Sequence, residues 1–363
     1  MPRSPLVLLP LALCLMLGCG TPPTAVSPTA ATVATPIAAQ PTTAVSAPTA
    51  TAAPAPTVSP SPTPTPLVSV RLVAPPMALG SWQVDVADRK GFFREQGLFL
   101  ERAEAEEDKA IVALVQRARD VALLSTPTIA GAVRDGEGVV MVAGAVNRAA
   151  YSLIGARDAE DLGGLIGKSV GIRDSKDVTT AILRRTTKAG GLGEAAYQLL
   201  AFPDPNVRAA ALVNGTVGGS LVDAPRAARL QVRGFKTLGN AWAAVPDYQD
   251  QGLAVRADWA GENSDRLVRF LRAIVAADRW IYAPENRDES IGILAATLRM
   301  TAAESGRLYE QYVEQAPAIP RNGEIAEAGV RVVVEMLAEL QALPPPLPDP
   351  ARLVDTSYLQ RAR

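Results

Sequence analysis

The chain has 363 residues, of which 48% are hydrophobic, and a net charge of -1 at pH 7. It contains no histidine, and its two cysteines are Cys14 and Cys19. The missing histidine excludes Ser-His-Asp and Cys-His catalysis, histidine-ligated zinc and the usual general base at neutral pH. The balanced charge provides no basic field of the kind that nucleic-acid binding needs, so we expect no nucleic-acid partner.

The first 19 residues have the parts of a secretory signal. Arg3 supplies a positive charge, and residues 6–17 form an apolar stretch that is too short to span a bilayer comfortably. The run LMLGC at residues 15–19 resembles a bacterial lipobox, in which the cysteine is lipidated and becomes the new N-terminus. The resemblance implies a signal peptide over residues 1–18 and a lipid on Cys19. The alternative is an ordinary signal peptide that is cut nearby and leaves Cys19 as an odd thiol.

The next segment predicts a tether. Residues 20–66 consist almost wholly of Ala, Thr, Pro, Ser and Val and carry no charge. Such a composition cannot bury enough apolar surface to offset the entropy of ordering the chain. We therefore expect residues 19–66 to be a lipid anchor and a disordered tether that holds a folded domain off the extracytoplasmic face of the cell membrane. Residues 67–363 are the expected folded part, long enough to prefer two lobes.

Short apolar runs alternate with amphipathic stretches as far as residue 256, and this pattern predicts an α/β fold. Strands are expected at 68–74, 98–103, 120–124, 139–145, 151–156, 168–172, 198–202, 219–222, 235–238 and 252–255. Helices are expected between them at 81–90, 108–117, 178–188 and 206–213. After residue 256 the pattern predicts helices alone: a long one capped by Asn263 or Ser264, then 285–298, 302–313 and 323–340.

Four stretches in series resemble one family of importer substrate-binding proteins, whose members bind sulfonates, nitrate, riboflavin and thiamine precursors. VADRKGFFREQGL at residues 86–98 is similar to the family's "ArekGfFkeeGLdVe" stretch, and residues 113–122 are similar to "ALvsGqvDfal". Residues 161–172 and 255–273 resemble "dLkGKkVgv" and the family's return strand with its long helix. One departure is Gly218, which stands where the family usually has Asp, so the packing of that loop and the usual ligand are open.

The resemblance implies a type II periplasmic binding-protein fold, an α/β fold of two lobes. Each lobe would be a mixed sheet flanked by helices, and the C-terminal region would be helical. Lobe 1 would comprise residues 67–152 and 250–363, and lobe 2 residues 153–249. Ligand would lie in the cleft at the carboxyl ends of the strands, where open α/β sheets generally bind ligands.

Ser175 and Thr179 are the first candidate ligand-binding residues. They lie where a predicted strand turns into a predicted helix, so free backbone amides and the positive end of the helix dipole suit a carboxylate, sulfonate or phosphate. The alternative is that Asp174, Ser175 or Asp177 merely caps the helix. Both functions are compatible.

The remaining candidates follow other predicted strands. Ser125 and Thr126 end a buried strand, where they contact ligand or where Thr126 caps the next helix. Asn147 offers a donor and an acceptor but suits a turn equally. Trp82 either stacks on a flat ligand or packs in the core. Asp223 either pairs with a ligand amine or caps a helix.

We therefore expect a monomeric binding protein that delivers a small polar or anionic ligand to an ABC permease, with a planar group suggested by Trp82. No catalytic residue, cofactor or metal is expected. The family also includes a pyrimidine-precursor synthase that consumes its own histidine, and that chemistry is unavailable to a chain without histidine. The alternative function is a lipoprotein sensor or scaffold that uses the same cleft. The identity of the ligand and any glycosylation of the tether are open.

Overall fold

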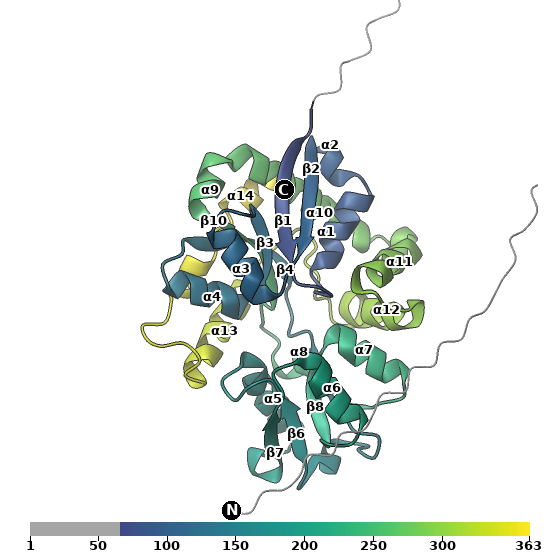
Figure 1. The fold of residues 1–363 in the computed structure, drawn as a ribbon. Helices are drawn as coiled ribbons and strands as arrows, with labels where there is room; N and C mark the ends of the chain where they lie inside the picture. Colours follow the sequence, from purple (N-terminus) through teal and green to yellow (C-terminus); the bar gives the residue numbers. More distant parts are fainter. Residues whose placement is uncertain (1–65) are drawn as a thin grey trace, which may run out of the picture. The chain divides into compact units, whose positions relative to one another are not determined.

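The computed structural model describes residues 66–363. The predicted signal peptide, Cys19 and residues 19–65 of the predicted tether lie outside the described residues. Two five-stranded mixed sheets flanked by helices form the framework of the described residues, which cluster as one unit (Figure 1). Within residues 66–363, no helix has the length and apolar character needed to cross a membrane.

Sheet A has the strand order β2-β1-β3-β10-β4. β1 pairs with β2 and β3 in parallel, whereas β10 is antiparallel to both of its neighbours. The apolar run of β3 is buried from Val121 to Leu124, as expected of a central strand that is covered on both faces. The strands are β1 (Val68–Ala74), β2 (Leu98–Glu104), β3 (Val121–Ser125), β4 (Val139–Val146) and β10 (Gln251–Arg256).

Sheet B has the corresponding order, β7-β6-β8-β5-β9. β6 is parallel to β7 and β8, and β5 is antiparallel to β8 and β9. In each sheet, then, the single antiparallel strand lies second from one edge. The strands are β5 (Tyr151–Gly155), β6 (Ser169–Ile172), β7 (Gln198–Ala201), β8 (Gly219–Asp223) and β9 (Thr237–Asn240). We call the part around sheet A lobe 1 and the part around sheet B lobe 2.

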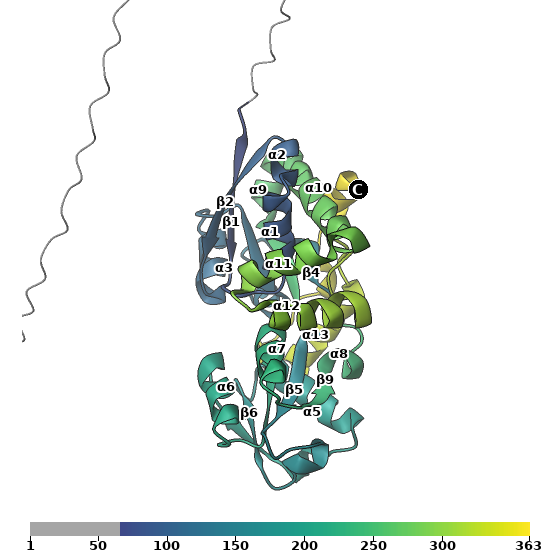
Figure 2. The ribbon, with the colours of Figure 1, turned by 90° about the vertical axis from the view of Figure 1, so that its right-hand side faces the viewer.

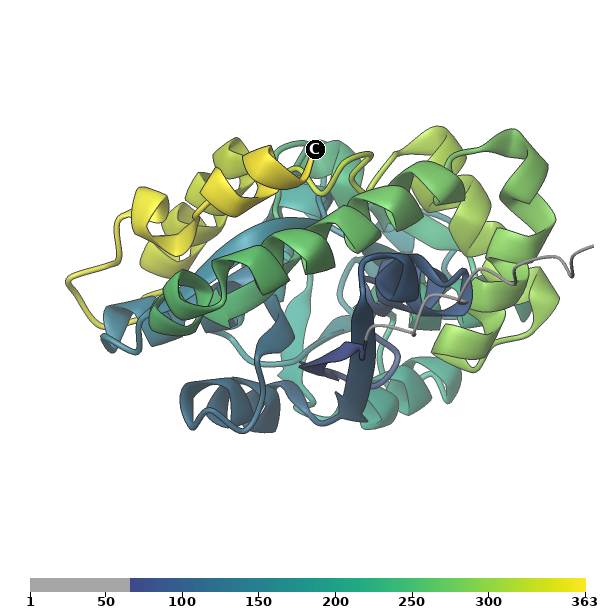
Figure 3. The same ribbon diagram turned by 90° about the horizontal axis from the view of Figure 1, so that it is seen from above.

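The helices of lobe 1 come from both ends of the folded region. The longest, α10, packs against α1, α2 and α14 and crosses sheet A, as Figure 3 shows from above. Its buried face includes Leu267, Phe270 and Ile274, as the apolar spacing predicts. The helices of lobe 1 are α1 (Ser81–Arg89), α2 (Phe92–Glu95), α3 (Glu107–Val115), α4 (Thr126–Arg134), α9 (Ala257–Glu262), α10 (Ser264–Ile281), α11 (Arg287–Leu298), α12 (Ala302–Tyr309), α13 (Glu327–Glu339) and α14 (Ser357–Ala362).

Lobe 2 has shorter helices on a smaller sheet. Its helices are α5 (Val178–Ala189), α6 (Pro205–Val213), α7 (Ala224–Val232) and α8 (Ala241–Ala244). α7 lies against α12 of lobe 1 (Figure 2). There the Arg229 guanidinium donates to the carbonyl oxygens of Leu298 and Arg299, at 3.2 and 3.0 Å. On another side Arg185 of α5 pairs with Glu339 of α13 at 2.9 Å, so helices of the two lobes meet in two places.

Three features of the predicted helices differ from the structure, while several other helix ends lie one or two residues from the predicted positions. The helix predicted from residue 323 begins at Glu327, because the Glu324 carboxylate accepts the amides of Arg321 and Asn322 and holds these residues in a turn. The helix predicted at 302–313 is α-helical to Tyr309 and continues as one π-helical segment, η4 (Glu310–Gln315). Ser125, rather than Thr126, caps α4, since the Ser125 hydroxyl group accepts the amide of Thr128.

Candidate functional site

The two crossings between the sheets bring polar side chains together at the carboxyl ends of strands. Tyr151 opens β5 after the first crossing, and Asp250 precedes β10 after the second. The Tyr151 hydroxyl group donates to Asp250 Oδ1 at 3.1 Å, although the two residues are 99 positions apart. This hydrogen bond therefore joins the two crossings at the point where both lobes meet.

Two of the predicted residues lie next to this pair through strand register. Tyr151 is the partner of Asp223 across β5 and β8, and Ser125 is the partner of Gln251 across β10 and β3. The amide of Thr126 donates to the Asp250 carbonyl oxygen at 3.0 Å, and its hydroxyl group donates to Gln249 O at 2.6 Å. Ser125 and Thr126 thus approach the pair from lobe 1 and Asp223 from lobe 2, as the topological argument predicts. Thr126 itself is fully buried.

Burial dominates the electrostatics of the pair. It raises the pKa of the Asp250 carboxyl group to about 8, an effect that the hydrogen bond from Tyr151 opposes and the charges of Glu107 and Asp223 reinforce. Burial, followed by the charge of Asp250, also raises the pKa values of Tyr151 and Tyr248 well above normal. The surroundings of Asp250 are therefore dry and rich in acids.

Several of these acidic side chains accept hydrogen bonds from backbone amides at helix starts near this region. Asp177 caps α5 and accepts the amide of Thr179 at 2.9 Å, and Asp223 caps α7 and accepts the amide of Arg226 at 3.0 Å. Glu107, in the first turn of α3, accepts the amide of Ser125 at 2.5 Å. The capping alternatives are thus realised for Asp177 and Asp223, and the donors predicted to bind an anion already hold carboxylates.

Thr179 and Ser175 remain at the start of α5. The Thr179 hydroxyl group donates to Asp177, and Ser175 is exposed in the turn that Asp174 closes by accepting the amide of Lys176 at 2.8 Å. The Thr179 hydroxyl group therefore points toward Asp177, the capping residue of its own helix. A role of either residue in ligand binding stays a prediction.

Trp82 and Asn147 have other side-chain partners. Trp82 is fully buried, its indole N–H donates to Ser290 O at 3.2 Å, and its ring packs edge-to-face on Tyr309 at 5.9 Å. This placement favours the packing alternative for Trp82. Asn147 donates through Nδ2 to Glu324 O at 2.7 Å, while its buried Oδ1 has no hydrogen-bond partner among residues 66–363. Asn147 therefore binds the turn before α13.

We call Glu107, Asp177, Asp223 and Asp250, together with Tyr151, Tyr248 and Tyr312, the junction cluster. Asp223 was predicted as a ligand-binding residue and Asp177 as a helix cap, whereas the other five were not predicted from the sequence. Tyr312, on η4, is 1% exposed, and its pKa is raised by burial and by Asp250 and Asp223. The feature of the sequence that could have indicated the site is the pair Tyr248 and Asp250, directly before the return strand. Apolar residues could have formed the same connection, so a polar pair at this position suggests a function.

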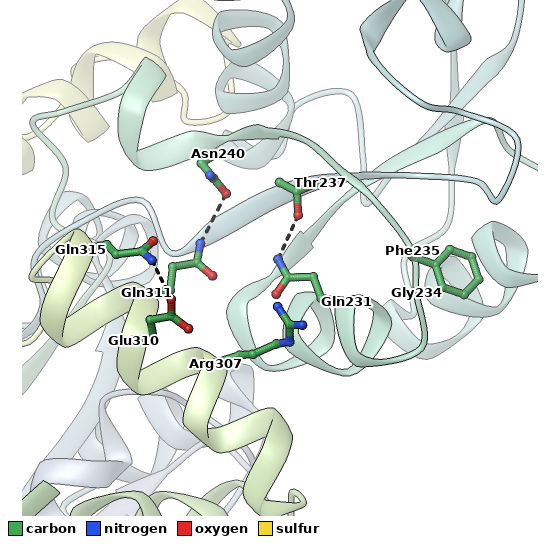
Figure 4. Close-up of a pocket in the computed structure, with 9 residues that line it drawn as sticks. All are labelled: Gln231, Gly234, Phe235, Thr237, Asn240, Arg307, Glu310, Gln311 and Gln315. Carbon is green, nitrogen blue, oxygen red and sulfur yellow. Dashed lines mark hydrogen bonds between the residues drawn. The ribbon is translucent and has the colours of Figure 1, made fainter.

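A polar hollow with a volume of about 400 Å³ lies between η4, α7 and β9 (Figure 4). Side-chain amides bond across it: Gln311 donates to Asn240 Oδ1 at 3.3 Å, which joins η4 to β9. Asn240 also accepts the hydroxyl group of Ser152, the residue after Tyr151, at 3.1 Å. The lining residues are Gln231, Gly234, Phe235, Thr237, Asn240, Arg307, Glu310, Gln311 and Gln315.

Known structures share this fold. The ligand-binding component of an ABC-type import system from Staphylococcus aureus is 14% identical, with a TM-score of 0.67, and the match covers 82% of this chain and 99% of that one. The periplasmic aliphatic sulphonate-binding protein SsuA from Escherichia coli is 18% identical, with a TM-score of 0.65 and coverages of 81% and 99%. The periplasmic nitrate-binding protein NrtA from Synechocystis is 15% identical, with a TM-score of 0.63 and coverages of 81% and 88%.

The fold also carries catalysis. The desulfurization enzyme DszB, in a complex with biphenyl-2-sulfinic acid, is 15% identical to this chain, with a TM-score of 0.63 and coverages of 81% and 98%. Likenesses at these identities show the type II periplasmic binding-protein fold alone. No curated protein sequence gives a significant match. The family profile described as NMT1/THI5 like matches residues 83–289, more than half of the sequence, and the chain therefore belongs to the NMT1/THI5-like family.

Proposed function

We propose that the protein is an extracytoplasmic solute-binding protein, anchored by a lipid on Cys19, that delivers a small polar solute to an ABC importer. The observation that carries the proposal is the junction cluster: polar groups from both lobes meet at the two crossings, where closure of the lobes would enclose a ligand. Tyr151 and Asp250 are bonded to each other there, and Glu107 and Asp223 approach from opposite sheets.

The family and the shared fold support a binding role, because the import component, the sulphonate-binding protein and the nitrate-binding protein have this architecture. The DszB structure makes catalysis the competing class. Against catalysis stands the composition: the sequence has no histidine, and both cysteines belong to the first 19 residues. Binding without covalent chemistry is therefore the proposed activity, by a monomer that docks on its permease.

Native mass spectrometry of the gently purified full chain tests this function. Tight binding proteins retain ligand, so we expect an added mass that is lost on denaturation. Added ligand at 100 times its dissociation constant stabilises a protein by about 2.7 kcal/mol, and we therefore expect at least one solute in a panel of sulfonates, pyrimidines, flavins, nitrate and amines to raise the melting temperature by several degrees. A bare polypeptide mass with no stabilisation by any solute contradicts the proposal.

A further inference from the structure

The charge of the junction cluster indicates which class of ligand the protein binds. This inference rests on the proposed binding function. Four carboxylates approach the meeting point of the lobes, from α3, the start of α5, the end of β8 and the second crossing. They belong to Glu107, Asp177, Asp223 and Asp250, and each of them raises the pKa of Tyr151 or Tyr248. The aromatic and acidic groups are thus within electrostatic reach of one another.

An anion at this place meets helix starts that already have capping carboxylates. The amide of Thr179 in α5 binds Asp177, the amide of Arg226 in α7 binds Asp223, and the amide of Ser125 binds Glu107. A sulfonate or nitrate would have to displace a carboxylate and would then lie beside the remaining ones. Coulombic repulsion at short range in a buried site makes that arrangement unfavourable.

One buried hydroxyl group lacks a partner in good hydrogen-bond geometry. The Tyr312 hydroxyl group is buried and makes no hydrogen bond of normal geometry within residues 66–363, although the Ser152 side chain is close enough to lower its pKa and Asp250 and Asp223 raise it. The Ser152 hydroxyl group donates to Asn240. Asp250 is 5% exposed, and among the described residues its side chain accepts a single hydrogen bond, from Tyr151 to Oδ1. Buried polar groups are rarely left unpaired, and a ligand donor would bind both the Tyr312 hydroxyl group and the Asp250 carboxyl group.

The arginines nearby pair with only two of the four carboxylates, those of Asp223 and Asp177. Arg226 pairs with Asp223 and also donates to Asn206, and Arg208 donates to the Phe202 carbonyl oxygen at 2.7 Å. Arg173 reaches Asp177 at 3.4 Å from a largely exposed position. Glu107 and Asp250 have neither an arginine nor a lysine as an ion-pair partner within residues 66–363. The charge of Glu107 is therefore uncompensated, and Asp250, with a pKa of about 8, takes on its charge at pH 7 when a cation lies beside it.

We infer that the junction cluster binds an organic cation, a small solute whose protonated amine, guanidinium or quaternary ammonium group lies against Asp250 and the tyrosines. Tyrosine rings stabilise such cations electrostatically. Tyr151 donates to the Asp250 carboxyl group, and Tyr248 and Tyr312 lie within its electrostatic reach. A metal ion does not fit, since no set of three acidic side chains in the described part of the chain is arranged to hold one.

The protonation state of Asp250 gives the inference a distinctive signature. With a pKa near 8 the empty site holds a proton at pH 7. A cation beside the carboxyl group lowers that pKa, so binding of a cation at pH 7 releases up to one proton from Asp250. An anion would raise the pKa further and release none from this group.

Isothermal titration calorimetry of the full chain tests the inference in two buffers of different ionisation enthalpy at pH 7. The probes are choline, agmatine and putrescine as cations, and isethionate, ethanesulfonate and nitrate as anions. We expect a cation to bind with proton release. Asp250→Asn should weaken it at least tenfold and abolish the release, and Tyr312→Phe should weaken it several-fold. Asp278→Asn, which changes a second buried carboxyl group outside the cluster, should retain both affinity and proton release.

The outcomes separate the two proposals. Binding of the anions alone, with unchanged or tighter affinity in Asp250→Asn, overturns the cationic ligand and leaves solute binding intact. Cation binding that survives Asp250→Asn also overturns it. Failure of both probe sets, together with a bare mass in the native spectrum, overturns the binding function itself.

Discussion

The two lobes share a strand order, but their sheets are covered unequally. In sheet A the strands β3 and β4 are buried along nearly their whole length, and α10 adds a long apolar face. In sheet B the edge strands β7 and β9 contain no buried residue. Because local stability follows buried apolar contact, lobe 2 is expected to open at a lower free energy than lobe 1. We therefore expect two lobes of the same topology to differ in rigidity, with lobe 1 the more rigid and lobe 2 the easier to open.

The largest expected effect comes from the core of lobe 1. Phe270→Ala removes a fully buried ring that stacks on Phe93 at 5.2 Å, and we expect the free energy of unfolding to fall by about 4 kcal/mol. The matched change in lobe 2, Leu212→Ala, should cost about 3 kcal/mol. Urea denaturation measures the loss in the free energy of unfolding for each variant, and hydrogen exchange shows in which sheet the protection is lost. If Leu212→Ala accelerates exchange in sheet A as much as in sheet B, the lobes are one cooperative unit and the comparison fails.

The second effect contrasts two buried acids. Burial raises the pKa of Asp250, at the junction, to about 8, and it raises that of Asp278, in α10 of lobe 1, well above normal. Between the unfolded pKa and the folded pKa the native state holds a proton that the unfolded state has lost. Raising the pH therefore lowers the free energy of unfolding, by up to about 1.4 kcal/mol per pH unit for each group.

Denaturation of the ligand-free protein between pH 4 and pH 9 measures this effect. In Asp250→Asn we expect the free energy of unfolding to fall less steeply with pH up to about pH 8. Above about pH 8 its slope should equal that of the unmodified protein. Asp278→Asn should remove its own contribution independently, because it lies in another part of the fold. Parallel curves for Asp250→Asn and the unmodified protein would show that Asp250 titrates normally.

A smaller effect concerns the contact between α7 and α12. Arg229→Ala removes the donors to the carbonyl oxygens of Leu298 and Arg299, at the end of α11. We expect a loss of about 1 kcal/mol and a more open arrangement of the lobes. Small-angle scattering should show a larger radius of gyration for Arg229→Ala, whereas Arg229→Lys, which keeps the charge, should show a smaller change. An unchanged radius in Arg229→Ala would mean that this contact does not hold the lobes.

The smallest effect is expected at the other contact between lobes. Arg185 and Glu339 form an ion pair at 2.9 Å, but their side chains are 34% and 59% exposed. Such pairs contribute about 0.5 kcal/mol or less, so Arg185→Ala should leave the melting temperature within about 1 °C of the original. A larger drop would make this side, rather than α7 and α12, the stronger link.

Most of the framework could be predicted because its signals are local. β1 begins and ends where its apolar run does, at Val68 and Ala74, and the buried stripe of α10 follows from helical spacing. The start of α13 could not be predicted, since it depends on Glu324 binding the backbone before it. Family, fold class and the positions of most strands were thus accessible from residues 66–363 alone.

Only part of the candidate site could be predicted from the sequence. Ser125, Thr126 and Asp223 could be proposed because each ends a strand, and register does bring them to the junction. Tyr151 and Asp250 could not be paired from sequence, since their contact exists only once both crossings are in place. The anionic ligand expected from the start of α5 rested on free amides, but whether Asp177 would occupy them depended on a side-chain conformation.

The strand order has a consequence for biosynthesis. Sheet B is one contiguous stretch, from Tyr151 to Asn240, whereas sheet A needs β10, which follows all of it in the chain. During synthesis lobe 2 can therefore assemble while β3 and β4 still lack the strand that lies between them. The apolar run of β3 is left as an open edge in that interval, the kind of surface that invites aggregation. Translation or export that pauses before residue 251 should consequently make this protein dependent on chaperones.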